Sequence, residues 1–243
     1  MKTERFHICS IIVCSMVALA TGSACAELVV NRAIVVFDSP SQHRQDVELV
    51  NIDAGDNLFV DIESFQVERP GEDDQALTSL RGNENPGLIA TPQKAMIGPS
   101  NSQLVRFMNL DRDGDREKVF RVNMTPVTRP PEFDAGDVAR GETASQIQIV
   151  IGYQVLVIVP PVDPRAVVDY GRSGSSATFK NSGNSNYLLT DGRQCDPDAP
   201  EVCMDLVSYR VYPGNHRQVE LPFDGPFSYK IRTVAGITSQ RFE

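Results

Sequence analysis

The chain of 243 residues contains no tryptophan, three histidines and five cysteines. It also lacks an apolar run of the ~20 residues that a membrane-spanning helix needs. Its net charge is −9, and its lysines and arginines are scattered rather than clustered. Because a nucleic-acid binder needs clustered cations to neutralise phosphates, we expect no nucleic-acid partner.

The N-terminus has the features of an export signal. A basic start is followed by the short apolar run Ile8–Ala20 and then by Ala24-Cys25-Ala26. This order is typical of a secretory signal peptide, here residues 1–26, which is cleaved on export. Lipidation of Cys25 is an alternative to its removal, although Gly22 stands where a lipoprotein signal usually has a Leu-like residue.

Cleavage leaves two cysteines, Cys195 and Cys203, at the ends of "CDPDAPEVC". Two cysteines so close together in an exported chain predict one disulfide. A metal site is the alternative, but no second Cys or His pair stands at ligand spacing. We therefore expect a disulfide and no metal.

Short β-type runs recur along the whole mature chain, separated by turn signals such as "DAGDN", "NENPG" and "DRDGD". The first seven are "LVVNRAIVVF", "DVELVNI", "LFVDIESFQVE", "GLIATPQKAMI", "SQLVRFMNL", "KVFRVNMTPV" and "SQIQIVIGYQVLVIVPP", and six more follow residue 165. This spacing predicts an all-β protein with two immunoglobulin-like sandwiches in tandem. We place the first domain at residues 27–160 and the smaller, disulfide-bearing domain at 161–243, joined by a stiff Pro-rich elbow at "PPVDP".

The stretch Ser145–Pro161 changes character midway. Its first half alternates, with Ile147, Ile149 and Ile151 on one face and Tyr153 next in line, whereas its second half is apolar almost throughout. Alternation is typical of a strand buried on one face, and continuous apolarity of one buried on both. An ordinary sandwich strand also alternates, so the pattern alone leaves its role open.

Catalytic motifs are weak. His43 and His216 lie next to polar or turn-forming sequence and are expected at the surface, while "GRSGS" (Gly171–Ser175) lacks the last glycine of a nucleophile elbow. "DRDGDRE" (Asp111–Glu117) begins like a calcium loop, but its glycine is misplaced and Val122 stands where the last ligand belongs, so a solvated turn is favoured. We expect no enzyme activity and no cofactor.

Several motifs, in order, resemble those of the periplasmic pilus-assembly chaperones of the chaperone–usher pathway (PapD-like superfamily). They are "AIVVFD" (Ala33–Asp38), "GLIATPQKAMIGP" (Gly87–Pro99), "LVRF" (Leu104–Phe107) and "DREKVFRVNMTPV" (Asp115–Val127). The likeness runs from Leu28 to Thr233. "IGYQVLVIVP", "NSGNSNYLL" and the Cys195–Cys203 loop are similar to the non-classical branch, the alternate and common-pilus chaperones.

The resemblance implies a function. Such a chaperone acts in the periplasm of a Gram-negative bacterium, lends its seventh strand to an incomplete pilus subunit and delivers the subunit to an outer-membrane usher. The donor strand would use Ile147, Ile149, Ile151 and Tyr153, without ATP. The free protein could self-associate through the same apolar edge. An exported structural pilus subunit or adhesion module is the alternative.

The sequence also departs from the family. Its best-known members grip the subunit's C-terminal carboxylate with two basic residues, and the aligned positions here are Ile34 and Leu156. Arg32 and Arg106 are possible substitute anchors. Pro160 replaces an arginine of the interdomain ion-pair network, so the role of its expected partner, Glu117, is left open.

Overall fold

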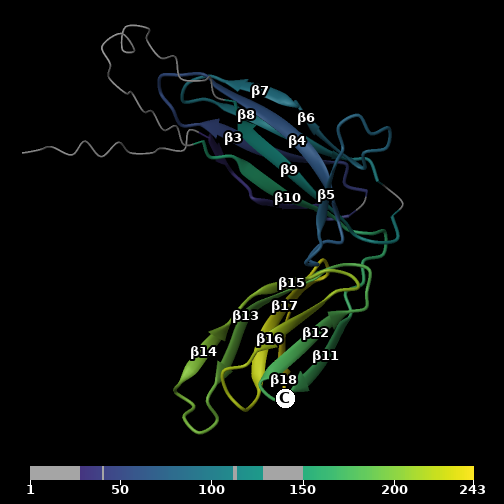
Figure 1. Ribbon diagram of the computed structural model, residues 1–243, viewed down its shortest axis with the longest axis vertical. Helices are drawn as coiled ribbons and strands as arrows, with labels where there is room; N and C mark the ends of the chain where they lie inside the picture. The colour runs from purple at the N-terminus through teal and green to yellow at the C-terminus, as the bar shows by residue number, and fades with distance from the viewer. Residues whose placement is uncertain (1–27, 40, 112–113, 128–149) are drawn as a thin grey trace, which may run out of the picture.

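The computed structural model describes residues 28–39, 41–111, 114–127 and 150–243. The described residues form strands and no helix, and so no helix among them could cross a membrane. The strands fall into two groups that share no sheet and meet at a bend (Figure 1). The protein is therefore all-β, with two sandwiches in tandem.

The first group holds ten described strands in two sheets. One sheet has the order β1-β3-β8-β6, and the other has the order β2-β10-β9-β4-β5, with β7 also paired to β4. The strands are β1 (Leu28–Val30), β2 (Ile34–Val36), β3 (Arg44–Asn51), β4 (Leu58–Glu68), β5 (Ala76–Ser79), β6 (Leu88–Thr91), β7 (Lys94–Ile97), β8 (Ser102–Asn109), β9 (Lys118–Pro126) and β10 (Tyr153–Val159). Alternate side chains of both sheets, Phe37, Phe107 and Phe120 among them, form one apolar core.

The second group is smaller. Its sheets have the orders β11-β12-β16 and β14-β13-β17-β18, with β15 also paired to β13. The strands are β11 (Val168–Ser173), β12 (Ser176–Asn181), β13 (Tyr187–Cys195), β14 (Cys203–Leu206), β15 (Tyr209–Val211), β16 (His216–Glu220), β17 (Phe227–Thr233) and β18 (Gly236–Phe242). Its core centres on aromatic rings, with Phe179 packed edge-on against Phe227 and Phe242 at centroid distances of 6.2 and 5.1 Å.

The predicted disulfide is confirmed: Cys195 and Cys203 are bonded and are also partners in the β13–β14 pair. Both predicted surface histidines, His43 and His216, are exposed. The signal peptide lies outside the described residues. The predicted domain boundary between residues 160 and 161 falls in the connection between β10 and β11.

The predicted number of strands was too low. "LVVNRAIVVF" is two strands because the chain passes from one sheet to the other after Val30, so that β1 pairs with β3 and β2 with β10. "GLIATPQKAMI" divides in the same way into β6 and β7 at Pro92, which has no N–H to donate to a ladder. In the second group "CMDLVSYRVY" divides into β14 and β15, and β5 and β18 were not predicted.

Candidate functional site

The two ends of β10 differ in their backbone pairing. Along one edge β10 is antiparallel to β9 from Tyr153 to Val159. Along the other edge β2 covers only Leu156–Ile158, with the Leu156 N–H donating to the carbonyl of Ala33 at 3.0 Å. Because backbone groups of alternate residues point to the same edge, the N–H and C=O of Gln154 face the side of β2. Among the described residues no strand pairs with β10 there, and so this edge is open within the described part of the chain.

The two faces of β10 differ as well. Val155, Val157 and Val159 point into the first core. Ile158 points the other way and is nevertheless fully buried, as is its cross-strand partner Val119, and neither belongs to either core. The elbow end of β10 is thus buried on both faces, which explains why its sequence is apolar at nearly every position.

The predicted donor residues are only partly within the described chain. Ile147 and Ile149 lie outside the described residues. Ile151 is 45% exposed just before β10, and Tyr153 begins the strand and packs against the first core. Their assignment as a donor strand stays a prediction.

The two positions at which the resemblance implied basic residues lie side by side. Ile34 and Leu156 are partners in the parallel β2–β10 pair. On the other side of Leu156 its partner is Arg121 of β9, whose Nη1 donates to Gln154 Oε1 at 2.6 Å. A guanidinium therefore lies one strand away from Leu156, one of the two positions at which the resemblance implied a cation. Sequence reasoning missed Arg121 because its proximity depends on the β9–β10 register.

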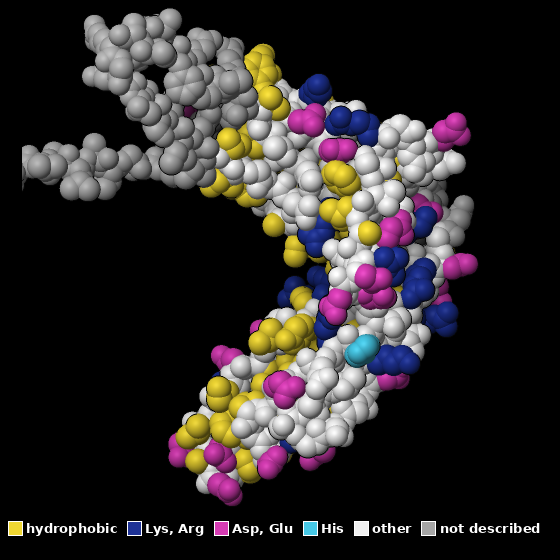
Figure 2. Space-filling model, in the orientation of Figure 1, with side chains coloured by type: hydrophobic (Ala, Val, Ile, Leu, Met, Phe, Trp, Pro, Cys, Tyr) yellow, Lys and Arg dark blue, Asp and Glu magenta, His cyan; other side chains and the backbone are white. Residues whose placement is uncertain are grey.

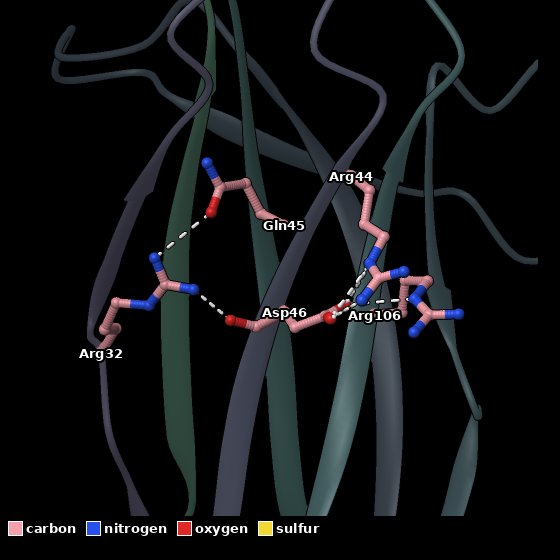
Figure 3. A network of polar contacts seen from close by, with 5 residues as sticks. All are labelled: Arg32, Arg44, Gln45, Asp46 and Arg106. Atoms are coloured by element: carbon pink, nitrogen blue, oxygen red, sulfur yellow. Dashed lines mark hydrogen bonds and ion pairs between the residues drawn. The ribbon is translucent and has the colours of Figure 1, made fainter.

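Arg32 and Arg106, the predicted anchors, both contact Asp46 of β3 (Figure 3). Arg106 Nε donates to Asp46 Oδ1 at 3.1 Å, Arg44 Nη2 donates to Oδ2 at 2.6 Å, and Arg32 donates to the Asp46 carbonyl and to Gln45. Hydrogen bonds from Arg44, and then from Arg106, hold the pKa of Asp46 below its ordinary value. The anchor role of Arg32 and Arg106 stays a prediction, and both already have partners.

Glu117 joins the two groups of strands. Its Oε2 accepts hydrogen bonds from Ser185 Oγ at 3.2 Å and from the backbone N and Nδ2 of Asn186 at 3.0 and 2.5 Å. Burial raises the pKa of Glu117, and these bonds and the charge of Arg210 oppose the rise. Arg210 donates to Asn186 Oδ1, so Asn186 links the side chain of Glu117 to a guanidinium of the second group.

A second contact between the groups involves the turn after β4. Asn215 Nδ2 donates to the Pro70 carbonyl at 2.6 Å, and Arg217 donates to the Gly71 carbonyl. Gly71 has φ of +82°, and a Cβ there would lie 2.7 Å from the Tyr212 ring. Only glycine fits this turn without strain, which fixes how closely the two groups approach.

Tyr212 lies beside this contact between the two groups of strands (called the joint below), where charged side chains act on its hydroxyl. Burial raises the pKa of Tyr212, and the negative charge of Glu117 raises it further. The positive charges of Arg210, Arg121 and Arg217 oppose this rise. The charges that act on this phenol therefore include three guanidiniums, one from the first group and two from the second. Figure 2 shows Lys and Arg side chains on the inner side of the bend as well as on its outer side.

No protein-family model matches the chain, and no curated protein matches it either. Solved structures do match. The Salmonella enterica SafB chaperone, solved with the SafA pilin, shares 12% identity at a TM-score of 0.62, covering 91% of this chain and 98% of that one. The class 5 fimbriae chaperone CfaA shares 16% identity at a TM-score of 0.59, covering 89% and 99%. The E. coli chaperone DraB shares 15% identity at a TM-score of 0.59, covering 89% and 95%.

At these identities the likeness concerns the fold. The chain consists of two immunoglobulin-like sandwiches in tandem, as the sequence predicted. More particularly, it has the two-domain fold of the fimbrial chaperones over almost its whole described length.

Proposed function

We propose that this chain is a periplasmic chaperone that binds pilus subunits by lending them the segment that leads into β10. The observation that carries the proposal is the open edge of β10 at Gln154, next to the exposed Ile151. An open strand edge with free backbone donors and acceptors is the surface to which an extended partner adds a strand.

Residue parity supports the choice of contacts. Tyr153, Val155 and Val157 face the first core, and Ile147, Ile149 and Ile151 have the same parity. If the strand continues toward its N-terminal side, these isoleucines lie on the same face but beyond the protein's own core, where a subunit's core would receive them. Full burial of each isoleucine contributes about 1.5–3 kcal/mol, part of which offsets the cost of association.

The cellular setting follows from the sequence and the fold together. The predicted signal peptide supports export to the periplasm, where subunits await assembly. Delivery to an outer-membrane usher belongs to the same proposal, because a lent strand must be exchanged for another subunit's segment at the site of assembly. Solved relatives with this fold include a chaperone in complex with a pilin.

The experiment is periplasmic co-expression with a candidate subunit encoded beside this gene, followed by co-purification. Ile149→Asp and Ile151→Asp should remove the subunit while the variants keep the circular dichroism of the parent. Ile237→Asp is the matched control, because Ile237 is also exposed, at 55%, but lies on β18 in the second group. Retention of the subunit by both folded β10-side variants would refute the proposal and favour the adhesion-module alternative.

A further inference from the structure

The last strand, β18, lies at one end of its sheet and is the longest edge strand among the described residues. On one side it pairs with β17 over its whole length, from Gly236 to Phe242, without a register shift. On its other side it pairs with no strand of the described chain. All of its side chains except Phe242 are exposed. A long, regular edge of this kind offers its free N–H and C=O groups to a further strand.

The features that usually keep an edge strand unpaired are weak in β18. Natural edges are protected by shortness, by lysine or proline, or by a bulge. The edge strand β14 of the same sheet has only four residues, and the edge strands β11 and β16 of the facing sheet each carry an acidic residue and an arginine. By contrast, β18 has no proline, no lysine and no bulge, and its one charged residue is Arg241.

The sequence of β18 is also complementary to itself. Ser239 is the middle residue of the strand, so an antiparallel pair of two β18 strands centred on Ser239 aligns the whole of each strand. In that register Thr238 lies opposite Gln240 of a second copy, and Ile237 lies opposite Arg241. Polar side chains then meet polar ones, the aliphatic part of the arginine covers the isoleucine, and no like charges face each other.

We propose that β18 pairs with β18 of a second copy of this chain, so that the two sheets join into one continuous sheet around a two-fold axis at Ser239. Such a contact is isologous, because the same surface of each copy is used. It involves no residue of β10, and it does not depend on the proposed function. It also differs from the self-association that the sequence predicted, which would use the apolar edge of the first group.

The distribution of charge supports this place of contact. The whole chain has a net charge of −9, but residues 161–243 contain nine Lys or Arg and ten Asp or Glu. Two second groups therefore repel each other little as they approach.

The direction of β18 supports the pairing as well. The β17–β18 hairpin adjoins the start of β13, next to the contacts with Glu117, and the chain ends on the side of the second group away from the bend (Figure 1). Antiparallel pairing therefore places the two bends, and with them the two first groups, at opposite ends of the dimer. Both β10 edges stay available in such a dimer.

Single cysteines test the register in the purified mature protein, whose Cys195 and Cys203 are already bonded to each other. On oxidation with copper phenanthroline, Ser239→Cys should form a disulfide-linked dimer, because directly opposite Cα atoms lie about 4.5–5.5 Å apart. Ile237→Cys and Arg241→Cys should not cross-link alone, since like positions would lie about 13 Å apart along the pair. An equal mixture of these two variants should cross-link. No dimer from Ser239→Cys, or equal cross-linking by all three single variants, overturns the pairing.

Sedimentation equilibrium tests the association without a cross-link. Across a dilution series the parent should show a monomer–dimer equilibrium. Ser239→Lys places two ammonium groups opposite each other and should raise the dimer Kd at least about tenfold. Thr178→Lys is the matched control, because it adds the same charge at an exposed position of β12, the central strand of the other sheet.

Circular dichroism verifies that both lysine variants fold as the parent does. A parent that is monomeric at every concentration overturns the proposal. Equal weakening of the dimer by Ser239→Lys and Thr178→Lys overturns it as well, because the effect would then come from net charge and not from β18.

Discussion

The two ends of β10 are adjacent in sequence and opposite in environment. At the elbow end, Val155–Val159 are buried or half-buried, and strands pair with both edges of the backbone. At the other end, Ile151 and Gly152 are exposed, and within the part of the chain that the structure describes the backbone of Gln154 has a strand on one side only. One end of the strand is therefore fixed within the fold, and under the proposed function the apolar residues at the other end serve recognition.

The difference between the two ends of β10 corresponds to the change from an alternating to a continuously apolar pattern within Ser145–Pro161. A core strand does not need to leave part of its edge uncovered. A binding strand detached from the core would lack a fixed position. Because the elbow end of β10 is paired on both edges within the first group, the Gln154 end is held in a defined direction (Figure 1).

The largest expected effect is at the elbow end. Val157→Asp places a carboxylate in the first core, where Val157 is fully buried and no cation is available among the core residues. We expect a loss of at least about 4 kcal/mol in the free energy of unfolding. Urea denaturation followed by circular dichroism measures it, and a near-parental midpoint would mean that this end is not core.

Removing the disulfide tests whether the stability of the second group affects subunit binding by β10. Its cysteines are eight residues apart, so replacing both by alanine should destabilise the second group by about 2–3 kcal/mol through the freed loop. The subunit should still co-purify below the melting transition, because β10 is unchanged. Loss of the subunit by a folded double variant would show that binding depends on more than β10 and the joint.

Glu117 gives a smaller effect that depends on pH. Because burial raises its pKa in the folded protein, the folded state holds the proton more tightly than the unfolded state. Stability from this group is therefore full below the ordinary glutamate pKa and is lost as the pH rises through the raised value. Urea midpoints of the parent should fall relative to Glu117→Gln across that window, and parallel profiles would contradict the account.

The smallest effect on stability is at the free end. Ile151→Asp changes an exposed side chain before the strand begins, so its free energy of unfolding should stay within about 0.5 kcal/mol of the parent. The comparison is sharpest if this variant folds normally and loses the subunit while Val157→Asp fails to fold. A strongly destabilised Ile151→Asp would place Ile151 in the protein's own core.

The sequence predicted much of this fold from local patterns. The alternating runs, the turn signals and the cysteine spacing indicated two sandwiches, the elbow and the disulfide. Arg121 and Arg210 could not be found in that way, because their positions depend on strand register and because these two residues, 89 positions apart in the chain, belong to different groups of strands. Nor could local patterns show that β1 and β2 belong to different sheets, since that depends on which distant strand each one meets.

The central claim, that a guest strand pairs with the open edge of β10, is tested most directly by amide hydrogen exchange with and without bound subunit. In the free protein the amide of Gln154 should exchange much faster than that of Val155, which faces β9. With the subunit bound, the account predicts that the Gln154 amide slows to the rate of the Leu156 amide, which already has a partner in Ala33. A bound subunit that leaves the exchange of Gln154 unchanged would contradict it.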